Sequence, residues 1–329
     1  MPETPPPGAE PLDPVPAPRV LLAGGGTAGH VNPLLATAAA LREPALGGRE
    51  ETGILVLGTA EGLEAGLVPE AGFDMAVVPR VPMPRRPTGD LFMLPRRLSR
   101  AVGAAGEAIE AVDAQVVVGF GGYVSTPAYL AARRAGVPVV IHEQNARPGL
   151  ANRLGASWAA AVALTFASTP LRSSKGRTEV TGLPLRPAIG ELVARLAEPD
   201  GAAAARRSGA AALGLDPQAP TVLITGGSLG AQRLNEVLAA ALPSLSPDLQ
   251  VLHLTGRDKD GPVRAAVEAA VADGAAADLA ERYHVLDYLV AMEQAYACAD
   301  GVICRSGAGT VAELTALGLP ALYVPLPIG

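Results

Sequence analysis

The sequence predicts an α/β protein built from two Rossmann-like domains, each a doubly wound parallel sheet. Three observations support this prediction. The chain has 329 residues, which suits two domains of about 150 residues each. Short β-branched runs alternate with Ala-rich helical stretches, the pattern of parallel sheets covered on both faces. The pattern also opens twice in the same way, because Val20–Gly29 and Val222–Gly230 both combine a strand, a glycine loop and a helix start.

Ten runs are predicted as strands, and their spacing leaves room for helices between them. The domain boundary is predicted near Gly182–Pro187, where glycine and proline interrupt the pattern. This boundary gives domains at residues 19–184 and 185–329, with an Ala-rich helical segment at Gly190–Ala212 before the second sheet. The predicted strands are Arg19–Ala23, Ile54–Leu57, Val116–Gly119, Pro138–Ile141, Ala161–Thr165, Thr221–Thr225, Gln250–Leu254, Tyr283–Leu286, Gly301–Cys304 and Ala321–Val324.

Composition excludes several classes of protein. The net charge of −6 gives no support for nucleic-acid binding. No window approaches the roughly 20 uncharged apolar residues of a membrane span, so a soluble protein is expected. Residues 1–18 are proline-rich without an apolar run, and we expect a disordered tail rather than a signal peptide. Cys298 and Cys304 lie in apolar stretches, which favours reduced core thiols and a cytoplasmic protein.

Glycine loops follow four predicted strands, at Gly24–Gly29, Gly119–Gly122, Gly226–Gly230 and Ser306–Gly309. Such loops expose backbone N–H groups at helix N-termini, where phosphates bind, and they lie at the carboxyl ends of strands. One loop alone is equally well explained by the steric needs of a tight turn. Four together favour a ligand site. Neither the dinucleotide fingerprint nor a Walker lysine is present, which disfavours an NAD-dependent enzyme.

Two side chains beside these loops are candidates for chemistry. His30 directly follows the first loop, whereas Ala231 stands at the equivalent place of the repeat, so the fold does not require histidine there. Its pKa range suits a general base, with a structural histidine as the alternative. Glu313 lies one helical turn after the fourth loop and can accept hydrogen bonds from ribose hydroxyls. The alternative for Glu313 is an acid favoured by the helix dipole.

Other polar groups receive different interpretations. The block His142–Asn145 places four polar residues after an apolar strand, which is more typical of a site than of a surface turn. It lacks a third metal ligand, so no metal site is predicted. Asp258–Asp260 has the spacing of a metal-binding DxD but lies in a polar loop, and we interpret it as solvated. His253 and His284 lie in or at strands and are interpreted as structural.

Six arginines surround the apolar cluster Leu91–Leu94, between Arg80 and Arg100. Basic residues beside an exposed apolar cluster favour binding to an anionic membrane surface. A solvated loop with a buried apolar anchor explains the same residues, and both interpretations stay open. The six are Arg80, Arg85, Arg86, Arg96, Arg97 and Arg100.

The order and spacing of these motifs resemble the MurG family of glycosyltransferases, from about Arg19 to the last residue. The fold implied by the resemblance is GT-B, in which two Rossmann-like domains face each other across a cleft. The motifs are Gly25–His30 with Asn32 and Pro33, Gly121–Tyr123, His142–Asn145 with Gly149, Leu150 and Asn152, Gly226–Ser228 with Gly230 and Ala231, and Arg305–Ala308 with Thr310 and Glu313.

The resemblance implies a reaction of peptidoglycan synthesis. N-acetylglucosamine would pass, with inversion and without a metal ion or cofactor, from its UDP donor to undecaprenyl-pyrophosphoryl-muramyl-pentapeptide. The enzyme would be peripheral, on the cytoplasmic side of the cell membrane. The N-terminal domain would hold the lipid-linked acceptor and contact the anionic membrane surface, and the C-terminal domain would bind the UDP-sugar.

Site residues are implied by the same resemblance. His30 would be the catalytic base, Arg186 would bind the donor phosphates, and the backbone of Leu289 would bind the uracil. The UDP moiety would be bound by Ser228, Ala308, Gly309, Thr310 and Glu313, with Val311 and Ala312 in the same segment. Thr27, Ala28, Gly29 and Asn145 would reach the donor sugar or the cleft.

The sequence departs from the family pattern in three places. Ala28 replaces the second glycine usual in the first loop, and Leu229 stands where many members have glutamine. The chain also ends at Gly329, before the glutamine-containing donor segment of the family, so we expect a fragment whose donor-binding domain is incomplete. Rival interpretations are another GT-B enzyme, such as a natural-product glycosyltransferase or a UDP-N-acetylglucosamine 2-epimerase, and a non-catalytic membrane-docking scaffold.

Overall fold

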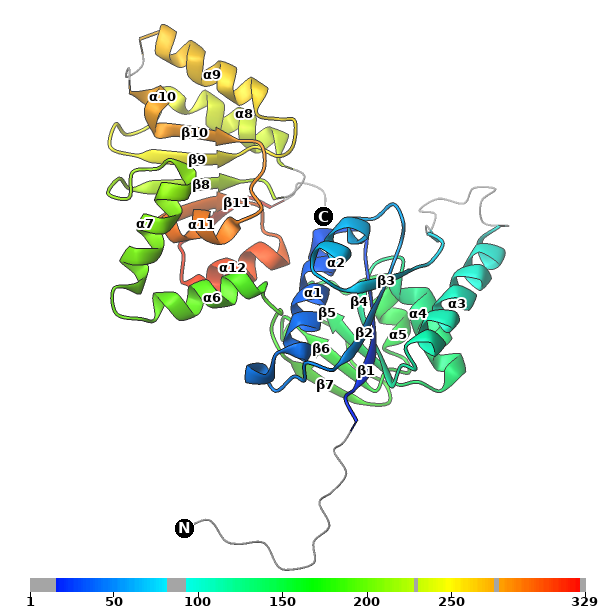
Figure 1. Ribbon diagram of the computed structural model, residues 1–329. Helices are drawn as coiled ribbons and strands as arrows, with labels where there is room; N and C mark the ends of the chain where they lie inside the picture. Colours follow the sequence, from blue (N-terminus) through cyan, green and yellow to red (C-terminus); the bar gives the residue numbers. More distant parts are fainter. Residues whose placement is uncertain (1–15, 82–92, 228–229, 275–277, 326–329) are drawn as a thin grey trace, which may run out of the picture.

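The computed structural model describes residues 16–81, 93–227, 230–274 and 278–325, which form two lobes joined by one connection (Figure 1). The first lobe contains a seven-stranded sheet and the second a five-stranded sheet. Within the described residues every strand pairing is parallel. The connection between the lobes runs from the end of the last strand of the first sheet to a helix that begins at Pro187.

The elements alternate regularly in both lobes. The first lobe contains β1 (Arg19–Gly24), α1 (Ala28–Arg42), β2 (Gly53–Gly58), α2 (Glu64–Glu70), β3 (Asp74–Val77), α3 (Leu94–Ala111), β4 (Val116–Gly121), α4 (Ser125–Ala135), β5 (Val139–Glu143), α5 (Leu150–Gly155), β6 (Ala161–Leu164) and β7 (Arg177–Val180). The second contains α6 (Pro187–Leu196), α7 (Gly201–Leu213), β8 (Thr221–Thr225), α8 (Gln232–Ala240), β9 (Gln250–Leu254), α9 (Gly261–Ala272), α10 (Leu279–Arg282), β10 (Tyr283–Leu286), α11 (Met292–Cys298), β11 (Gly301–Cys304), α12 (Ala308–Leu317) and β12 (Ala321–Tyr323).

The two sheets share one strand order, which confirms the predicted fold class. The first runs β3-β2-β1-β4-β5-β6-β7 and the second β10-β9-β8-β11-β12. In both, the first strand of the sheet lies between the second and the fourth, which is the Rossmann order. The predicted repeat therefore reflects equivalent positions, since β1 and β8 are each the first strand of their sheet and lie between its second and fourth strands. Ligands of such sheets bind where the order reverses, beside the carboxyl ends of β1 and β4 or of β8 and β11.

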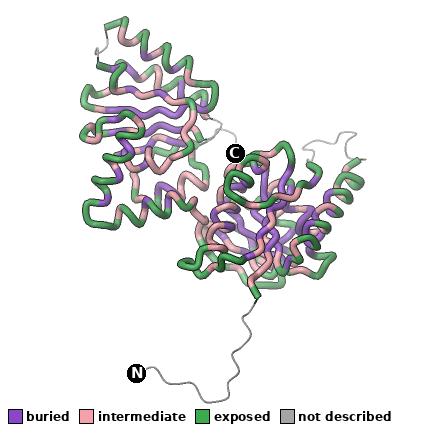
Figure 2. The backbone as a smooth tube through the Cα atoms, in the orientation of Figure 1, coloured by how far each residue is buried: buried purple, intermediate pink, exposed green. Residues whose placement is uncertain are grey.

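The central strands are buried on both faces, as parallel strands covered by helices must be (Figure 2). Along β1, Leu21 packs with α3, α4 and α5, whereas Leu22 packs on the other face with α1 and α2. The second sheet repeats this layering. Leu223 packs with α6, α7, α11 and α12, and Ile224 packs with α8, α9 and α10. Alternating apolar side chains thus hold two helical layers on each sheet.

Ten of the described strands were predicted from the sequence, and two were not. The missed strands, β3 and β7, form the two edges of the seven-stranded sheet. An edge strand pairs on one side only and tolerates polar residues, and β7 has the sequence Arg-Thr-Glu-Val with mostly exposed side chains. Two strands also extend two residues beyond their predicted ends, because β4 continues to Gly121 and β5 continues through His142 and Glu143.

The domain connection and the cysteines have simple structural contexts. The predicted boundary between residues 184 and 185 lies in the segment between β7 and α6, and α6 packs against α7, α11 and α12 of the second lobe. Cys298 and Cys304 are both buried and free, which agrees with the expectation of reduced thiols. The tail predicted at residues 1–18 lies almost wholly outside the described residues.

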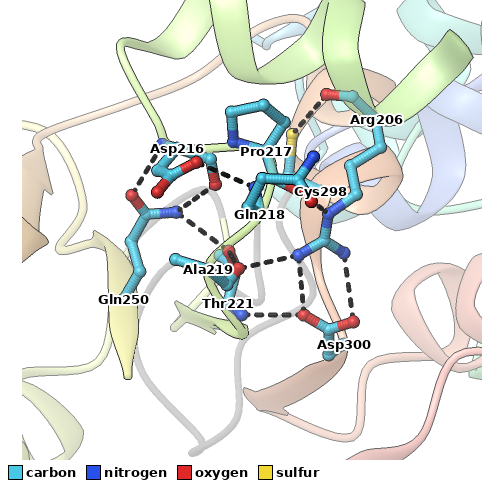
Figure 3. A network of polar contacts seen from close by, with 9 residues as sticks. All are labelled: Arg206, Asp216, Pro217, Gln218, Ala219, Thr221, Gln250, Cys298 and Asp300. Carbon is cyan, nitrogen blue, oxygen red and sulfur yellow. Dashed lines mark hydrogen bonds and ion pairs between the residues drawn. The ribbon is translucent and has the colours of Figure 1, made fainter. Parts of the chain in front are cut away.

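A network of polar contacts joins the amino ends of the strands in the second sheet, opposite the end that carries the glycine loops (Figure 3). Arg206 of α7 donates from both Nη atoms to the carboxylate of Asp300, at 3.0 and 2.9 Å, just before β11. The same carboxylate accepts from the N–H of Thr221, at the start of β8, at 2.7 Å. Gln250, at the start of β9, donates to the Thr221 hydroxyl at 2.9 Å. Charge-assisted bonds therefore join α7, β8 and β11, and a neutral hydrogen bond adds β9.

Replacing Asp300 with alanine is expected to lower the free energy of unfolding by about 1–3 kcal/mol, because Arg206 and the Thr221 N–H lose their acceptor. Burial raises the pKa of Asp300, but hydrogen bonds from Arg206 and Thr221 outweigh it and hold the pKa below its usual range. The contribution is therefore complete above the unfolded pKa and is lost as pH falls through the folded value.

Urea unfolding of Asp300→Ala and of the native chain at neutral and acid pH measures this. The difference between them should shrink at acid pH. Asp248→Ala, an exposed carboxylate before β9, is the matched control. A loss that does not depend on pH, or an equal loss in the control, would contradict the assigned role of Asp300.

Candidate functional site

The loops after β1 and β4 line a cavity of about 500 Å³ in the first lobe. These loops meet at the point where the strand order of the sheet reverses, the usual ligand position of the fold. The helix α2 and the segment after β3 complete the wall. The lining residues are Gly25, Gly26, Thr27, His30, Thr59, Glu61, Gly62, Leu63, Glu64, Arg80, Gly122, Tyr123 and Val124.

His30 lies in the first turn of α1, half-buried at the wall of this cavity. Its Nδ1 is 3.1 Å from the carbonyl oxygen of Gly25 and 3.1 Å from the hydroxyl of Thr27. A carbonyl oxygen has no proton to donate, so Nδ1 carries the hydrogen and donates it. In the neutral ring the lone pair is then on Nε2. A histidine that acts as a general base through Nε2 must be in this tautomer.

Burial keeps His30 neutral. Burial lowers the pKa of His30, while the hydrogen bond to Gly25 and the charges of Glu143 and Glu64 oppose that effect without cancelling it. The pKa therefore lies below its usual value of 6.5. At neutral pH the ring is an uncharged acceptor, able to take a proton from a hydroxyl.

Two glycine loops approach each other closely at this histidine. Gly122, after β4, has φ +82°, and a Cβ placed on it would lie 2.4 Å from the carbonyl oxygen of Gly25. Only glycine fits there, for both conformational and steric reasons. Because that carbonyl is the one that accepts from His30, the glycine at position 122 contributes to the placement of the imidazole.

The end of β5 organises the predicted block around a buried carboxylate. Oε1 of Glu143 accepts from the N–H and the side-chain amide of Asn145, at 2.9 and 3.1 Å. Oε2 accepts from the N–H of Gly149 at 3.0 Å and from the amide of Asn152 at 2.9 Å. Asn145 itself is exposed and its amide is oriented by Glu143. His142 donates from Nε2 to the Gly182 carbonyl at 2.9 Å, beside the connection between the lobes.

In the second lobe Glu313 and Arg186 form a partly buried ion pair, with 2.9 Å between Oε1 and the guanidinium Nε. The other carboxylate oxygen of Glu313 accepts from the hydroxyl of Tyr296 at 3.0 Å. Burial lowers the pKa of Arg186, but the Glu313 charge outweighs burial and the pKa is raised. Two residues predicted separately as ligand groups are thus joined by α6 and α12, next to the carboxyl end of β11.

Five of the remaining predicted residues of the second lobe lie in α12. Ala308, Gly309 and Thr310 form the first turn of α12, whose N–H groups have no partner within the helix. Val311 and Ala312 follow in the same helix and are half-buried. The Leu289 side chain packs against the core after β10. Ser228 and Leu229 lie outside the described residues.

In the first lobe, Thr27, Ala28 and Gly29 form the turn into α1 and are exposed or half-buried. His253, interpreted as structural, is fully buried and contacts the Tyr283 hydroxyl at 2.9 Å and the Asn235 amide oxygen at 3.1 Å. Nothing among the described residues brings three or more His, Cys, Asp or Glu side chains into a metal-binding group. Asp260 pairs with Arg264 on α9 instead.

The arginine-rich segment is described only in part, since residues 82–92 lie outside the described residues. Arg96, Arg97 and Arg100 lie on α3, whose N-terminal neighbour Met93 is exposed. Arg80 stacks on the ring of Tyr123, 5.3 Å from its centroid, at the cavity wall. In the described part of the chain no helix has both the length and the apolarity to cross a membrane.

Two residues of the site were not predicted from the sequence. Glu64 lies behind the first glycine loop, and the Tyr296 hydroxyl donates to Glu313. Tyr123 was named only as part of a motif, and its ring lies under the Arg80 guanidinium. A sequence signal existed for Glu64, because it is an acid at the start of a short apolar helix that follows glycines at positions 58 and 62. No such signal marked Tyr296, which lies in an ordinary helical stretch.

Comparisons with known proteins agree with this geometry. The chain matches the Glycosyltransferase family 28 N-terminal domain over residues 20–164 and the Glycosyltransferase family 28 C-terminal domain over residues 221–329. A protein of Bifidobacterium longum (strain DJO10A) is 49% identical over 320 residues, which are 95% of this chain and 80% of that protein. One of Frankia casuarinae is 52% identical over 311 residues, with 94% and 77% covered. Both are named UDP-N-acetylglucosamine:N-acetylmuramyl-(pentapeptide) pyrophosphoryl-undecaprenol N-acetylglucosamine transferase.

Solved structures extend the comparison. The MurG of Acinetobacter baumannii superposes with a TM-score of 0.67 at 29% identity, covering 95% of this chain and 80% of that one. A UDP-GlcNAc 2-epimerase of Neisseria meningitidis superposes with a TM-score of 0.62 at 14% identity, covering 92% and 81%. The second likeness shows the fold alone.

Proposed function

The chain belongs to glycosyltransferase family 28, and from that premise we propose that it transfers N-acetylglucosamine from UDP-N-acetylglucosamine to undecaprenyl-pyrophosphoryl-muramyl-pentapeptide. This is a step of peptidoglycan synthesis, and it matches the names of relatives that are about half identical over nearly the whole chain. The observation that carries the proposal is the presence of two sites, one in each lobe. One holds a neutral histidine at a cavity, and the other holds a carboxylate and an arginine at a helix N-terminus.

The donor would bind in the second lobe. The first-turn amides of α12 form a helix N-terminus, which favours the diphosphate of UDP. Glu313 lies on the same helix, one turn further on, where its carboxylate can accept from the ribose hydroxyls. Arg186 uses Nε for Glu313, and within the described residues its Nη atoms make no hydrogen bond. They are available for phosphate oxygens, and Ser228 and the Leu289 backbone would complete the site.

The acceptor would bind in the first lobe, with its sugar hydroxyl at Nε2 of His30. Inversion needs a single displacement, in which the hydroxyl oxygen bonds to the anomeric carbon as the bond to UDP breaks. His30 would take the hydroxyl proton, and the leaving diphosphate would be stabilised by the α12 amides and Arg186. The amides and the arginine would thus stabilise the negative charge of the leaving diphosphate, which a metal ion stabilises in other transferases. Thr27, Ala28, Gly29 and Asn145 would line the space for the donor sugar.

The acceptor is lipid-linked, so the first lobe must meet a membrane. We place the contact at the segment between Arg80 and Arg100, on the cytoplasmic face. The support is the basic N-terminal turn of α3 beside the exposed Met93, a combination that favours an anionic surface. Co-sedimentation with vesicles containing anionic lipid, but not with neutral vesicles, is expected. Equal binding to both would remove the electrostatic part of this proposal.

The test of the proposed reaction is a transfer assay with UDP-N-acetylglucosamine and the lipid-linked acceptor in detergent, with chelator present. Formation of a disaccharide lipid with an inverted anomeric centre, unaffected by the chelator, is expected. Donor binding without turnover would instead indicate a scaffold, and release of UDP with epimerised sugar would indicate a 2-epimerase. A requirement for a divalent metal would contradict the mechanism.

A further inference from the structure

A second buried carboxylate lies directly behind the glycine loop that holds His30. Glu64, the first residue of α2, has no exposed surface at all. Glycines surround it, because a Cβ placed on Gly25, Gly58 or Gly62 would lie within 2.7 Å of its side chain. A fully buried carboxylate enclosed by three glycines is energetically unfavourable unless specific hydrogen bonds offset the loss of hydration.

Such hydrogen bonds are present, and in each of them the Glu64 carboxylate accepts. Oε1 of Glu64 accepts from the N–H and the hydroxyl of Thr59, at 3.0 and 2.8 Å. Oε2 accepts from the N–H of Gly26 at 2.9 Å. Burial raises the pKa of Glu64, but these hydrogen bonds outweigh burial and leave the pKa below its usual range. Glu64 is therefore ionised at neutral pH and places a negative charge inside the wall of the cavity.

The N–H of Gly26 and the carbonyl of Gly25 belong to one peptide group. Glu64 accepts from one end of this group, and the other end accepts from Nδ1 of His30 at 3.1 Å. Hydrogen bonds in such a chain polarise one another, so a carboxylate at the N–H end makes the carbonyl end a stronger acceptor. Carboxylate, peptide and imidazole thus form one line, with Nε2 of His30 at the end that faces the cavity.

We propose that Glu64 is a positioning residue that acts on His30 through the Gly25–Gly26 peptide, fixing the Nδ1–H tautomer and increasing the basicity of Nε2. A carboxylate that accepts directly from a catalytic histidine fixes its tautomer and raises its basicity. Here a peptide group lies between the carboxylate and the histidine and transmits the same effect. The catalytic importance of this contact rests on the proposed function. The geometric coupling does not, and it can be measured on the protein alone.

Other charges around His30 must stay constant in a test. The groups that face it from the neighbouring elements are Glu143 on β5, Glu61 before α2, Arg80 after β3 and Tyr123 after β4. A substitution at Glu64 leaves all of them in place. Glu70→Gln removes a charge from the exposed end of the same helix and is the matched control.

The first measurement uses the unaltered chain. Nitrogen NMR of ¹⁵N-histidine-labelled protein, with the signals of the four histidines assigned by substitution, reports which ring nitrogen of His30 carries the proton. The Nδ1–H form is expected at neutral pH. The Nε2–H form would overturn the proposal, whatever the variants do.

The second measurement compares Glu64→Gln and Glu70→Gln. The titration midpoint of His30 should move to lower pH in Glu64→Gln and stay unchanged in Glu70→Gln, because only the first removes the charge behind the peptide. In the transfer assay, Glu64→Gln should lower kcat on the order of tenfold and move the acid limb of kcat/KM in parallel. Donor binding in the other lobe should be unchanged.

The possible outcomes distinguish a failure of the coupling between Glu64 and His30 from a failure of the proposed function. An unshifted His30 midpoint in folded Glu64→Gln overturns the coupling. A shifted midpoint in a chain that transfers no sugar leaves the coupling intact and contradicts the proposed function. A lower kcat with the acid limb unmoved assigns Glu64 a merely structural role and also overturns the proposal.

Discussion

Replacing Glu313 with glutamine is expected to weaken the binding of UDP-N-acetylglucosamine by roughly 10- to 100-fold, the effect of losing a charge-assisted pair of hydrogen bonds. Both carboxylate oxygens already accept, one from Arg186 and one from Tyr296. An amide must direct its NH₂ group at one of these donors, so the substitution disturbs the site even though the side-chain size is kept. Calorimetry in the presence of chelator measures the change.

Glu313 can contribute directly, by binding the ribose, or indirectly, by holding Arg186. A double-mutant cycle with Arg186→Gln distinguishes the two. Direct binding predicts that Glu313→Gln still weakens the donor complex when Arg186 is already replaced. If the double variant binds as well as Arg186→Gln alone, Glu313 only positions the arginine. Glu268→Gln, an exposed acid on α9, is the control for loss of charge in the same lobe.

The fold was predictable because the buried strands carry their own signal. Val20–Ala23 and Val222–Ile224 are apolar at every position, and the glycines that follow mark where each strand ends. The edges of the first sheet lacked that signal. β3 and β7 have one unpaired side and exposed residues, so their sequences are constrained by a single neighbour.

The candidate site was predictable only where its residues lie next to a glycine loop in sequence. His30 and Glu313 follow their glycine loops directly, and the structure places both at the switch points of the sheets. The contact between Glu64 and Gly26 joins residues 38 positions apart. The pair formed by Arg186 and Glu313 joins residues 127 apart. Such contacts depend on how α2 and α6 pack, which local patterns do not encode.

Substituting His30 with asparagine is expected to lower kcat by roughly 10²- to 10⁴-fold while leaving the dissociation constant of the donor unchanged. Asparagine can still donate to the Gly25 carbonyl, so the loop keeps a partner, but no group remains that can take the acceptor proton. Single-turnover transfer and donor calorimetry on the same samples separate the two effects. A kcat within tenfold of the native value would show that another group is the base.

The pH dependence gives the same prediction an independent check. The base acts in its neutral form, and burial holds the pKa of His30 below 6.5. The acid limb of kcat/KM should therefore be level through neutral pH and fall only as the pH drops through the lowered pKa. Protonation removes the lone pair on Nε2, and this limb should be absent from the residual activity of His30→Asn. An acid limb that survives the substitution would have to come from another titratable group, which would contradict the assignment of His30 as the base.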